Sequence, residues 1–245
     1  MNTGVPILSG ESNIGLGRSR NEDNYCIVAT PGFPSRFAMV VDGIGGHADG
    51  DVASMYCCRR IMHAFLREGR RISDIRSAAK FLVAEISAAN RSLCERNEFD
   101  RRKRPMGCTA ICAVFTPGWI TFCGAGDSRL YEYDRSSGKL RQLSTDDVNC
   151  DGSALCRAVG IRRNLLPEPK SIPLAAGNIH LLCSDGLHHF VAENEIAAVL
   201  SEAATARMAV STLMRRALLR NAGDNITIIA AFSPKSDPDA NIIPF

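Results

Sequence analysis

Four aspartates stand where an apolar segment of the chain ends or begins, a place where a bare charge needs an explanation. In chain order, they follow "FAMVV", "TFCGAG" and "IHLLCS" and precede the segment 226–232: Asp42, Asp127, Asp185 and Asp224. One Asp-Gly after a strand is typical of a surface turn. Four such aspartates, with a further acidic pair in "RNEDNY", favour a cluster of carboxylates at one rim of a sheet.

The acidic pair is Glu22-Asp23, and it precedes another apolar segment. Carboxylates gathered at one rim would repel and raise one another's pKa unless a cation neutralises them. Oxygen ligands without His or Cys favour Mg²⁺ or Mn²⁺ over Zn²⁺. Gly43 directly follows Asp42, and a residue without a side chain lets its carbonyl group approach an ion closely.

Two ions that share a carboxylate can activate water and stabilise charge on both sides of a displacement, which suits hydrolysis of a phosphate ester. Such a site also needs a group that holds the phosphate. Arg18 lies five residues before Asp23 and can bind phosphate bidentately. An ordinary surface arginine is the alternative interpretation of Arg18.

Composition restricts the class of protein. Hydrophobic residues make up 45% of the 245 residues, so a large core can form. The formal net charge of +3 argues against broad, charge-driven binding of nucleic acid. The one dense basic run, residues 101–104, is interpreted as a solvated loop, with a docking patch as the alternative.

The ten cysteines are scattered without a CxxC pair, and most lie inside apolar segments, where cysteine behaves as a small hydrophobe. The first residues lack the basic start and apolar core of a signal peptide. No stretch approaches the roughly 18 apolar residues of a membrane span. We therefore expect free thiols, a cytoplasmic location and no membrane partner.

Hydrophobic periodicity predicts helices over about 52–66 and 75–93 and within 193–219. Short apolar segments between turn residues predict strands at 25–29, 36–41, 109–115, 119–123, 129–133, 140–143, 178–183 and 226–232. This order is an α+β pattern, which two antiparallel sheets with helices packed outside would satisfy. We expect one domain over residues 1–245, with its core at about 10–232 and a tail at 233–245.

Six motifs in this order resemble the metal-dependent protein phosphatases of the type 2C class, the PPM family. They are "GLGRSRNEDN", "VVDGIGGHADGDVAS", "GCTAICAVF", "FCGAGDSRLYEY", "LLCSDGLHHFV" and "GDNITIIA". Together they cover roughly residues 10–232, and the "DGIGGH" form is similar to the bacterial branch. Any one of them is weak evidence, whereas six in sequence are a strong signal.

The resemblance implies a β-sandwich of two antiparallel sheets flanked by pairs of α-helices, a four-layer αββα fold. It implies hydrolysis of phosphoserine and phosphothreonine by water activated at a dinuclear Mn²⁺ or Mg²⁺ centre, without a phosphoenzyme. The implied partners are phosphorylated proteins, including a Ser/Thr kinase or its targets, and we expect a monomer.

The resemblance also assigns the metal ligands. Asp42 would bridge both ions, and the carbonyl of Gly43 would bind one of them. Asp185 and Asp224 would hold the other ion. Two further acids would contact the ions directly or through water, namely Glu22 and Asp23.

Two more roles follow from the resemblance. Arg18 would clamp the phosphate of the substrate, and with Asp42 it would form the catalytic pair. Asp127, together with Asp185, would suit a third, weaker metal site found in some members.

The chain departs from the family at two places. Many animal members carry His after the Asp-Gly as a proposed proton donor, whereas this chain has Ile44, and the family gives no warrant for transferring that role to the nearby His47. The segment 144–160 is short for the bacterial flap, which puts the metal role of Asp127 and any substrate preference taken from the family in doubt.

Three alternatives stay open at this point. The chain could be a catalytically silent module that binds phosphoproteins, although it retains every acid of the metal set. It could hydrolyse a small phosphate metabolite. The third alternative is a calcium site, because residues 147–152 resemble the start of an EF-hand loop, but the twelfth position is Ala158 instead of Glu. The adjacent His188 and His189 are expected to have structural or surface roles.

Overall fold

The structure is a computed structural model that describes residues 4–44, 49–99, 105–150 and 154–234. Within these ranges, ten strands form two five-stranded sheets in which every pair is antiparallel. The first sheet has the order β1-β10-β9-β6-β7. Its strands are β1 (Ile7–Asn13), β10 (Ile226–Phe232), β9 (Ile179–Cys183), β6 (Arg129–Asp134) and β7 (Lys139–Gln142).

The second sheet has the order β2-β3-β4-β5-β8. Its strands are β2 (Asn24–Val28), β3 (Arg36–Val41), β4 (Ala110–Thr116), β5 (Trp119–Ala125) and β8 (Lys170–Pro173). Two long helices, α1 (Gly50–Glu68) and α2 (Ile75–Phe99), cover its outer face, with a short 3₁₀ turn, η1 (Gly69–Arg71), between them.

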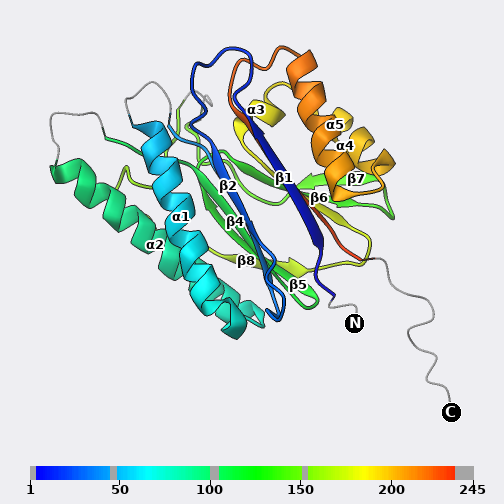
Figure 1. Ribbon diagram of the computed structural model, residues 1–245, viewed down its shortest axis with the longest axis horizontal. Coiled ribbons are helices and arrows are strands. Elements are labelled where there is room, and N and C mark those ends of the chain that lie inside the picture. The colour runs from blue at the N-terminus through cyan, green and yellow to red at the C-terminus, as the bar shows by residue number, and fades with distance from the viewer. Residues whose placement is uncertain (1–3, 45–48, 100–104, 151–153, 235–245) are drawn as a thin grey trace.

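The outer face of the first sheet is covered by α4 (Glu193–Glu202) and α5 (Ala206–Leu219), and the short α3 (Asp185–His188) follows β9. Figure 1 shows the two helix pairs on opposite sides of the packed sheets. The predicted four-layer αββα architecture is confirmed.

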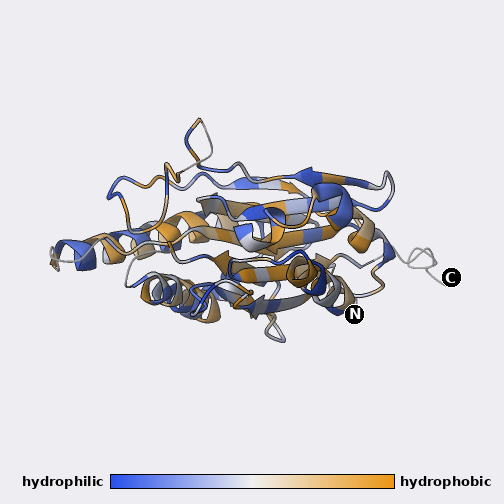
Figure 2. Cartoon of the chain, turned by 90° about the horizontal axis from the view of Figure 1, so that it is seen from above, coloured by the Kyte–Doolittle hydropathy of each residue, from blue (hydrophilic) through white to orange (hydrophobic). Residues whose placement is uncertain are grey.

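The alternation of side chains along the central strands explains this layering. In β3, Phe37, Met39 and Val41 pack under α1 and α2, whereas Ala38 and Val40 face the other sheet. Successive side chains of a strand point to opposite faces, so a strand between two layers must be apolar throughout. Figure 2 agrees, because hydrophobic residues colour the central strands and alternate with hydrophilic ones along the helices.

The predicted strands and helices all occur, whereas β1 and β8 were not predicted. Both lie at the edge of a sheet, and neither has a fully buried residue. Their sequences, ILSGESN and KSIP, therefore lack the apolar run on which the strand prediction depended. β1 begins at Ile7, three residues before the predicted start of the core.

All ten cysteines are free thiols, and only Cys150 and Cys156 are exposed, as the prediction of free thiols requires. In the part of the chain that the structure describes, no helix has the length and apolar character to cross a membrane. The predicted tail lies outside the described residues from residue 235 onward.

Candidate active site

A cavity of about 140 Å³ opens at the edge of the sandwich where β3, β5 and β9 end and where β2 and β10 begin. The antiparallel order brings these ends to one rim although the starts of β2 and β10 are about 200 residues apart in the sequence. The cavity is lined by Arg18, Glu22, Asp42, Gly43, Ile44, Thr109, Asp127, Leu155, Asp185, Asp224 and Asn225. The structure thus brings together every predicted site residue except Asp23, which lies behind the cavity wall.

Asp42 is held by its backbone at the end of β3. Its N–H donates to the Thr109 hydroxyl at 3.1 Å, and its carbonyl accepts from the Thr109 N–H at 2.7 Å. Gly43 then donates to the Glu22 carbonyl at 3.1 Å. A Cβ atom at residue 43 would lie 2.4 Å from the Gly50 carbonyl oxygen, so only glycine fits where the chain turns towards α1.

Glu22 is positioned by its own main chain. Its N–H donates to the side-chain oxygen of Asn225 at 2.8 Å, and its carbonyl accepts from the Ser54 hydroxyl of α1 at 2.5 Å. The Asn225 amide group donates in turn to the carbonyls of Ile14 and Arg20. One buried asparagine therefore joins the start of β10 to the loop that carries Arg18 and Glu22.

Asp23 is 5% exposed and accepts two short hydrogen bonds on one oxygen. The hydroxyls of Ser184 and Thr227 both donate to its Oδ2 at 2.7 Å. Its Oδ1 is buried without a hydrogen-bond partner in the described structure. An orphaned, buried carboxylate oxygen is costly unless a proton or a cation satisfies it.

Asp185 and Asp127 approach from the ends of β9 and β5. Asp185 begins α3, and its Oδ1 is a second buried oxygen without a partner among the described residues. The neighbouring histidines differ. His188 Nε2 lies 3.1 Å from the Asp127 carbonyl oxygen, whereas the exposed His189 places Nδ1 at 3.5 Å from Asp185 Oδ2.

Arg18 reaches the cavity from the loop between β1 and β2. Its Nη2 donates to Asp224 Oδ2 at 2.7 Å, and 43% of its side chain is exposed. This bond is the main reason that the pKa of the Arg18 guanidinium is raised, so the group stays charged. A guanidinium has five N–H donors, so Arg18 can hold Asp224 and an anion together.

Burial and mutual repulsion raise the pKa values of the acids in the cavity. Burial, followed by repulsion from Asp23, Asp185 and Asp127, raises the pKa of Asp42 well above its ordinary value. Burial also raises the pKa of Asp23 to about 6, against the opposing hydrogen bonds from Thr227 and Ser184. For Asp127, burial and the charge of Asp185 raise the pKa to about 6.

The pKa values of two more acids move in the same direction. Burial and the charge of Asp224 raise the pKa of Asp185, and burial and the charge of Asp51 raise the pKa of Glu22. Raised pKa values at several carboxylates in one cavity mean that each proton relieves repulsion. A divalent cation would relieve the same repulsion without protonation.

The donor set fits a hard dication. Among the described residues, no three carboxylate, imidazole or thiol groups already converge as a metal site. Asp224 contacts Arg18, and Asp185 lies near His189. The two orphaned oxygens of Asp23 and Asp185 nevertheless lack any other partner in the described chain. Carboxylate and carbonyl oxygens are the ligands that Mg²⁺ and Mn²⁺ prefer.

The segment 144–160 contributes Leu155 to the cavity lining. Val148 and Leu155 form an isolated antiparallel bridge, and Val159 pairs with Cys108. Leu155 lines the cavity beside Ile44. His47, the basic run 101–104 and residues 151–152 of the EF-like stretch lie outside the described residues.

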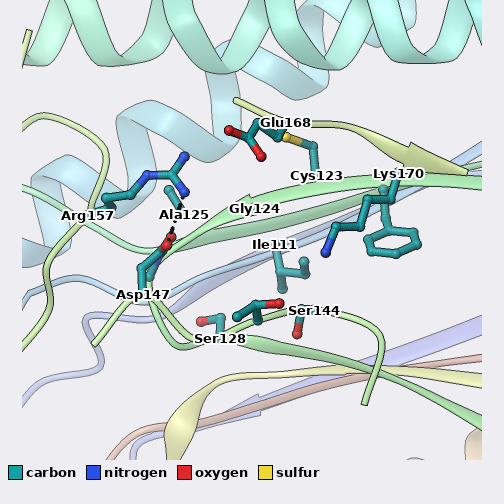
Figure 3. A pocket seen from close by; sticks show the side chains of 13 residues that line it. Ile111, Cys123, Gly124, Ala125, Ser128, Ser144, Asp147, Arg157, Glu168 and Lys170 are labelled. Carbon is teal, nitrogen blue, oxygen red and sulfur yellow. Dashed lines mark hydrogen bonds and ion pairs between the residues drawn. The ribbon is translucent and has the colours of Figure 1, made fainter. Parts of the chain in front are cut away.

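A second cavity of about 250 Å³ adjoins the first (Figure 3). The Ser128 hydroxyl lines it and lies 2.7 Å from Thr109 Oγ1, which lines the acidic cavity. Figure 3 shows Arg157 directed at Asp147, with Nη1 and Oδ1 3.0 Å apart. Glu168 and Lys170 also line this cavity, so its acidic and basic side chains balance in number, whereas the first cavity has five acids and one arginine.

Sequence reasoning did not single out the residues that hold the acids in place. Thr109, Ser184, Asn225 and Thr227 orient the site through the hydrogen bonds described above. The only sequence signal was their presence inside the motifs "GCTAICAVF", "LLCSDG" and "GDNITIIA".

Comparison with known proteins gives concordant matches. A family model described as Protein phosphatase 2C matches residues 10–221. The serine/threonine phosphatase stp of Listeria welshimeri serovar 6b is 26% identical over 231 residues, which cover 87% of this chain and 86% of that protein. The serine/threonine protein phosphatase PstP of Mycobacterium tuberculosis is 28% identical over 241 residues, 91% of this chain but 44% of that protein.

A solved structure extends this likeness to the fold. The crystal structure of the catalytic domain of PstP in complex with two manganese ions has a TM-score of 0.78 and 26% identity. The match covers 94% of this chain and 99% of that chain. The predicted resemblance is thereby confirmed.

Proposed function

Because this chain belongs to the protein phosphatase 2C family, we propose that it is a metal-dependent protein serine/threonine phosphatase that hydrolyses phosphoserine and phosphothreonine in proteins. One observation carries the proposal. Five acids and one arginine line a single small cavity, which is an arrangement that suits two cations and a phosphate. The two relatives described above are both named serine/threonine phosphatases, which supports the same reaction.

In this proposal, Asp42 and the Gly43 carbonyl would hold one ion, and Asp42, Asp185 and Asp224 would hold a second. Glu22 and Asp23 would contact the ions directly or through water, and a third, weaker site would use Asp127 with Asp185. Bound Mn²⁺ or Mg²⁺ supplies charge neutralisation and a water nucleophile. The two manganese ions bound to PstP support this choice of metal.

The other residues of the cavity would bind the phosphate, exclude water and hold the acids in place. Arg18 binds the phosphate oxygens through donors that Asp224 does not use, and Asp224 fixes the direction of the guanidinium. Ile44 and Leu155 give the cavity apolar walls that limit access of bulk water. The buried Asn225 keeps Glu22 and the Arg18 loop in register with β10.

The cavity lining argues against a phosphoenzyme on cysteine or serine. No cysteine or serine is present among the described residues that line it. The Thr109 hydroxyl accepts from the Asp42 N–H and is bonded to Ser128, so it is engaged in holding β3. The proposed substrates are proteins phosphorylated by Ser/Thr kinases.

The test is release of phosphate from a phosphothreonine peptide with Mn²⁺, with Mg²⁺ and with excess chelator. We expect turnover with metal, none with chelator, and a loss of turnover in Asp42→Asn. A folded protein that releases no phosphate with either metal would replace the proposal by a silent module that binds phosphoproteins. Faster turnover of small phosphoesters than of any phosphopeptide would redirect it to a metabolite phosphatase.

A further inference from the structure

A basic groove lies on the outer surface of the helix pair α1 and α2 and shares no lining residue with the acidic cavity. It has a volume of about 450 Å³, and no acidic side chain lines it within the described structure. Two apolar side chains from the first turns of α1 also line it, Val52 and Met55. The polar lining consists of Tyr56, Arg59, Arg60, His63, Arg67 and Arg96.

The positive charge of this groove is only partly compensated. Arg60 faces Glu85 at 3.9 Å, and Arg67 faces Glu68 at 3.8 Å, distances at the outer limit of an ion pair. Arg59 and Arg96 are exposed and have no ion pair with any described residue. Four arginines therefore concentrate charge in a chain whose net charge is only +3.

One arginine is oriented along the groove by an aromatic ring. The Arg96 guanidinium lies 5.7 Å from the centroid of the Tyr56 ring, which is a cation–π distance. Because α2 runs antiparallel to α1 in the pair, Arg96 from the end of α2 meets the beginning of α1 (Figure 1). The groove is thus built by both helices.

The groove begins next to the active-site cavity. α1 starts at Gly50, whose carbonyl oxygen packs against Gly43, and Val52 already lines the groove. With a helical rise of about 1.5 Å per residue, Arg59 lies roughly 14 Å from Gly50 along the axis, and Arg67 roughly 25 Å. An extended peptide covers these distances with about four and eight residues.

We propose that this groove binds an acidic segment of the protein substrate, about four to eight residues from the phosphorylated residue. The inference rests on the proposed function, because it assigns a substrate preference to that site. Charge complementarity selects the partner, and the mixture of arginines with Tyr56, Met55 and Val52 suits side chains of a peptide. A flat anionic bilayer would reach protruding basic residues, whereas these arginines line a hollow.

The test compares two phosphothreonine peptides with identical residues next to the phosphothreonine. One carries Asp and Glu at the fourth to eighth positions on both sides, and the other carries Asn and Gln there. The groove variant is Arg59→Gln/Arg96→Gln. The matched control is Arg207→Gln/Arg215→Gln, because both of these arginines are exposed on α5 and the charge change is the same.

We expect wild-type protein to prefer the acidic peptide, with a kcat/KM that is about five- to tenfold lower in the groove variant. The neutral peptide and p-nitrophenyl phosphate should be turned over equally by all three proteins. The control variant should retain the preference. An equal loss in both variants, or no preference for the acidic peptide in wild type, overturns the proposal.

A binding measurement separates this inference from the activity. Fluorescence anisotropy of a labelled acidic peptide without phosphate should show binding to wild type and the control, and weaker binding to the groove variant. This result holds even if no peptide is hydrolysed, so a failed proposed function does not conceal it. Binding of phosphatidylserine-containing vesicles that depends on Arg59 and Arg96, without peptide binding, would replace the proposal by a membrane site.

Discussion

The acidic cavity and the basic groove lie at the two sides of the first turn of α1, and they are built in opposite ways. The cavity holds five carboxylates around about 140 Å³, and four of them have pKa values raised by burial as the largest cause. The groove holds four arginines around about 450 Å³, two of them exposed without an ion pair among the described residues.

The difference lies in what holds each set of charges. The carboxylates are fixed by strand ends, by the close contact of Gly43 with Gly50 and by the buried Asn225. The arginines stand on helix surfaces, where each side chain is independent of the others. Single substitutions should therefore have large effects in the cavity and small, additive effects in the groove.

The largest effect is expected for Asp42→Asn, which tests the cavity directly. It removes the carboxylate whose pKa is raised by the charges of three other acids, Asp23, Asp185 and Asp127. Metal-dependent turnover should therefore fall by roughly 10²–10³-fold. Phosphate release at saturating Mn²⁺ measures the loss. Because the substitution also removes repulsion, the variant should unfold in chelator at a temperature no lower than wild type.

Thermal unfolding in chelator distinguishes a loss of the Asp42 carboxylate from a loss of folded protein. A variant that loses activity by unfolding would melt earlier in chelator, and this would show that Asp42 acts through structure. Full activity with an unchanged demand for metal would contradict the role assigned to Asp42.

The second largest effect is expected for a substitution of Gly43, whose backbone follows Asp42. Gly43→Ala places a Cβ atom 2.4 Å from the Gly50 carbonyl oxygen and 2.8 Å from that of Glu22, and neither backbone atom can move easily. We expect a loss of about 1–3 kcal/mol in the free energy of unfolding and a large loss of turnover. Urea unfolding monitored by circular dichroism checks the first part.

Gly223→Ala is the matched control, because a Cβ atom there meets nothing within 4 Å, and it lies beside Asp224. Equal stability of the two variants would mean that the contact between Gly43 and Gly50 does not shape the site.

The central strands of both sheets could all be predicted from the sequence, whereas two of the four edge strands, β1 and β8, could not. Arg36–Val41 and Ile226–Phe232 were predicted with their observed bounds, because both faces of these strands are buried and both strands are bounded by polar or turn residues. Ile7–Asn13 and Lys170–Pro173 were missed because an edge strand needs no apolar run.

The candidate site, too, could be predicted only in part from the sequence. Residue type and position predicted that the carboxylates gather at one rim, since an aspartate at the end of an apolar strand has few explanations. The hydrogen bonds of Asn225 to Glu22, Ile14 and Arg20 span more than 200 residues. Contacts of that range depend on the register between β1 and β10, which one sequence does not specify.

A smaller, pH-dependent effect distinguishes a strained acid from an ordinary one. The pKa of Asp127 is raised to about 6, so its protonated form contributes stability below the ordinary pKa of 3.8, and this contribution is lost as pH rises through 6. Asp127→Asn should therefore gain stability relative to wild type between pH 4 and 7. Thermal unfolding in chelator should show a gain of about 2–6 °C at pH 7.

Asp134 provides a control of opposite sign. Hydrogen bonds from Ser136 and Ser137 lower its pKa to about 2, so its contribution is present above pH 3.8 and is lost only as pH falls through 2. The difference between Asp134→Asn and wild type should stay constant from pH 4 to 7. A constant difference for Asp127→Asn as well would show that the acids in the cavity do not repel one another.

The smallest effect belongs to the groove. Arg59→Gln alone removes one exposed charge, and an exposed ion pair contributes little, so kcat/KM for the acidic peptide should fall only about two- to threefold. Arg96→Gln alone should have a similar effect, and the double variant should show roughly the product of the two. Raising the salt concentration should reduce both effects, because exposed charges are screened. A single variant as damaging as the double one would mean that the arginines act as a fixed unit, and the contrast with the acidic cavity would then be wrong.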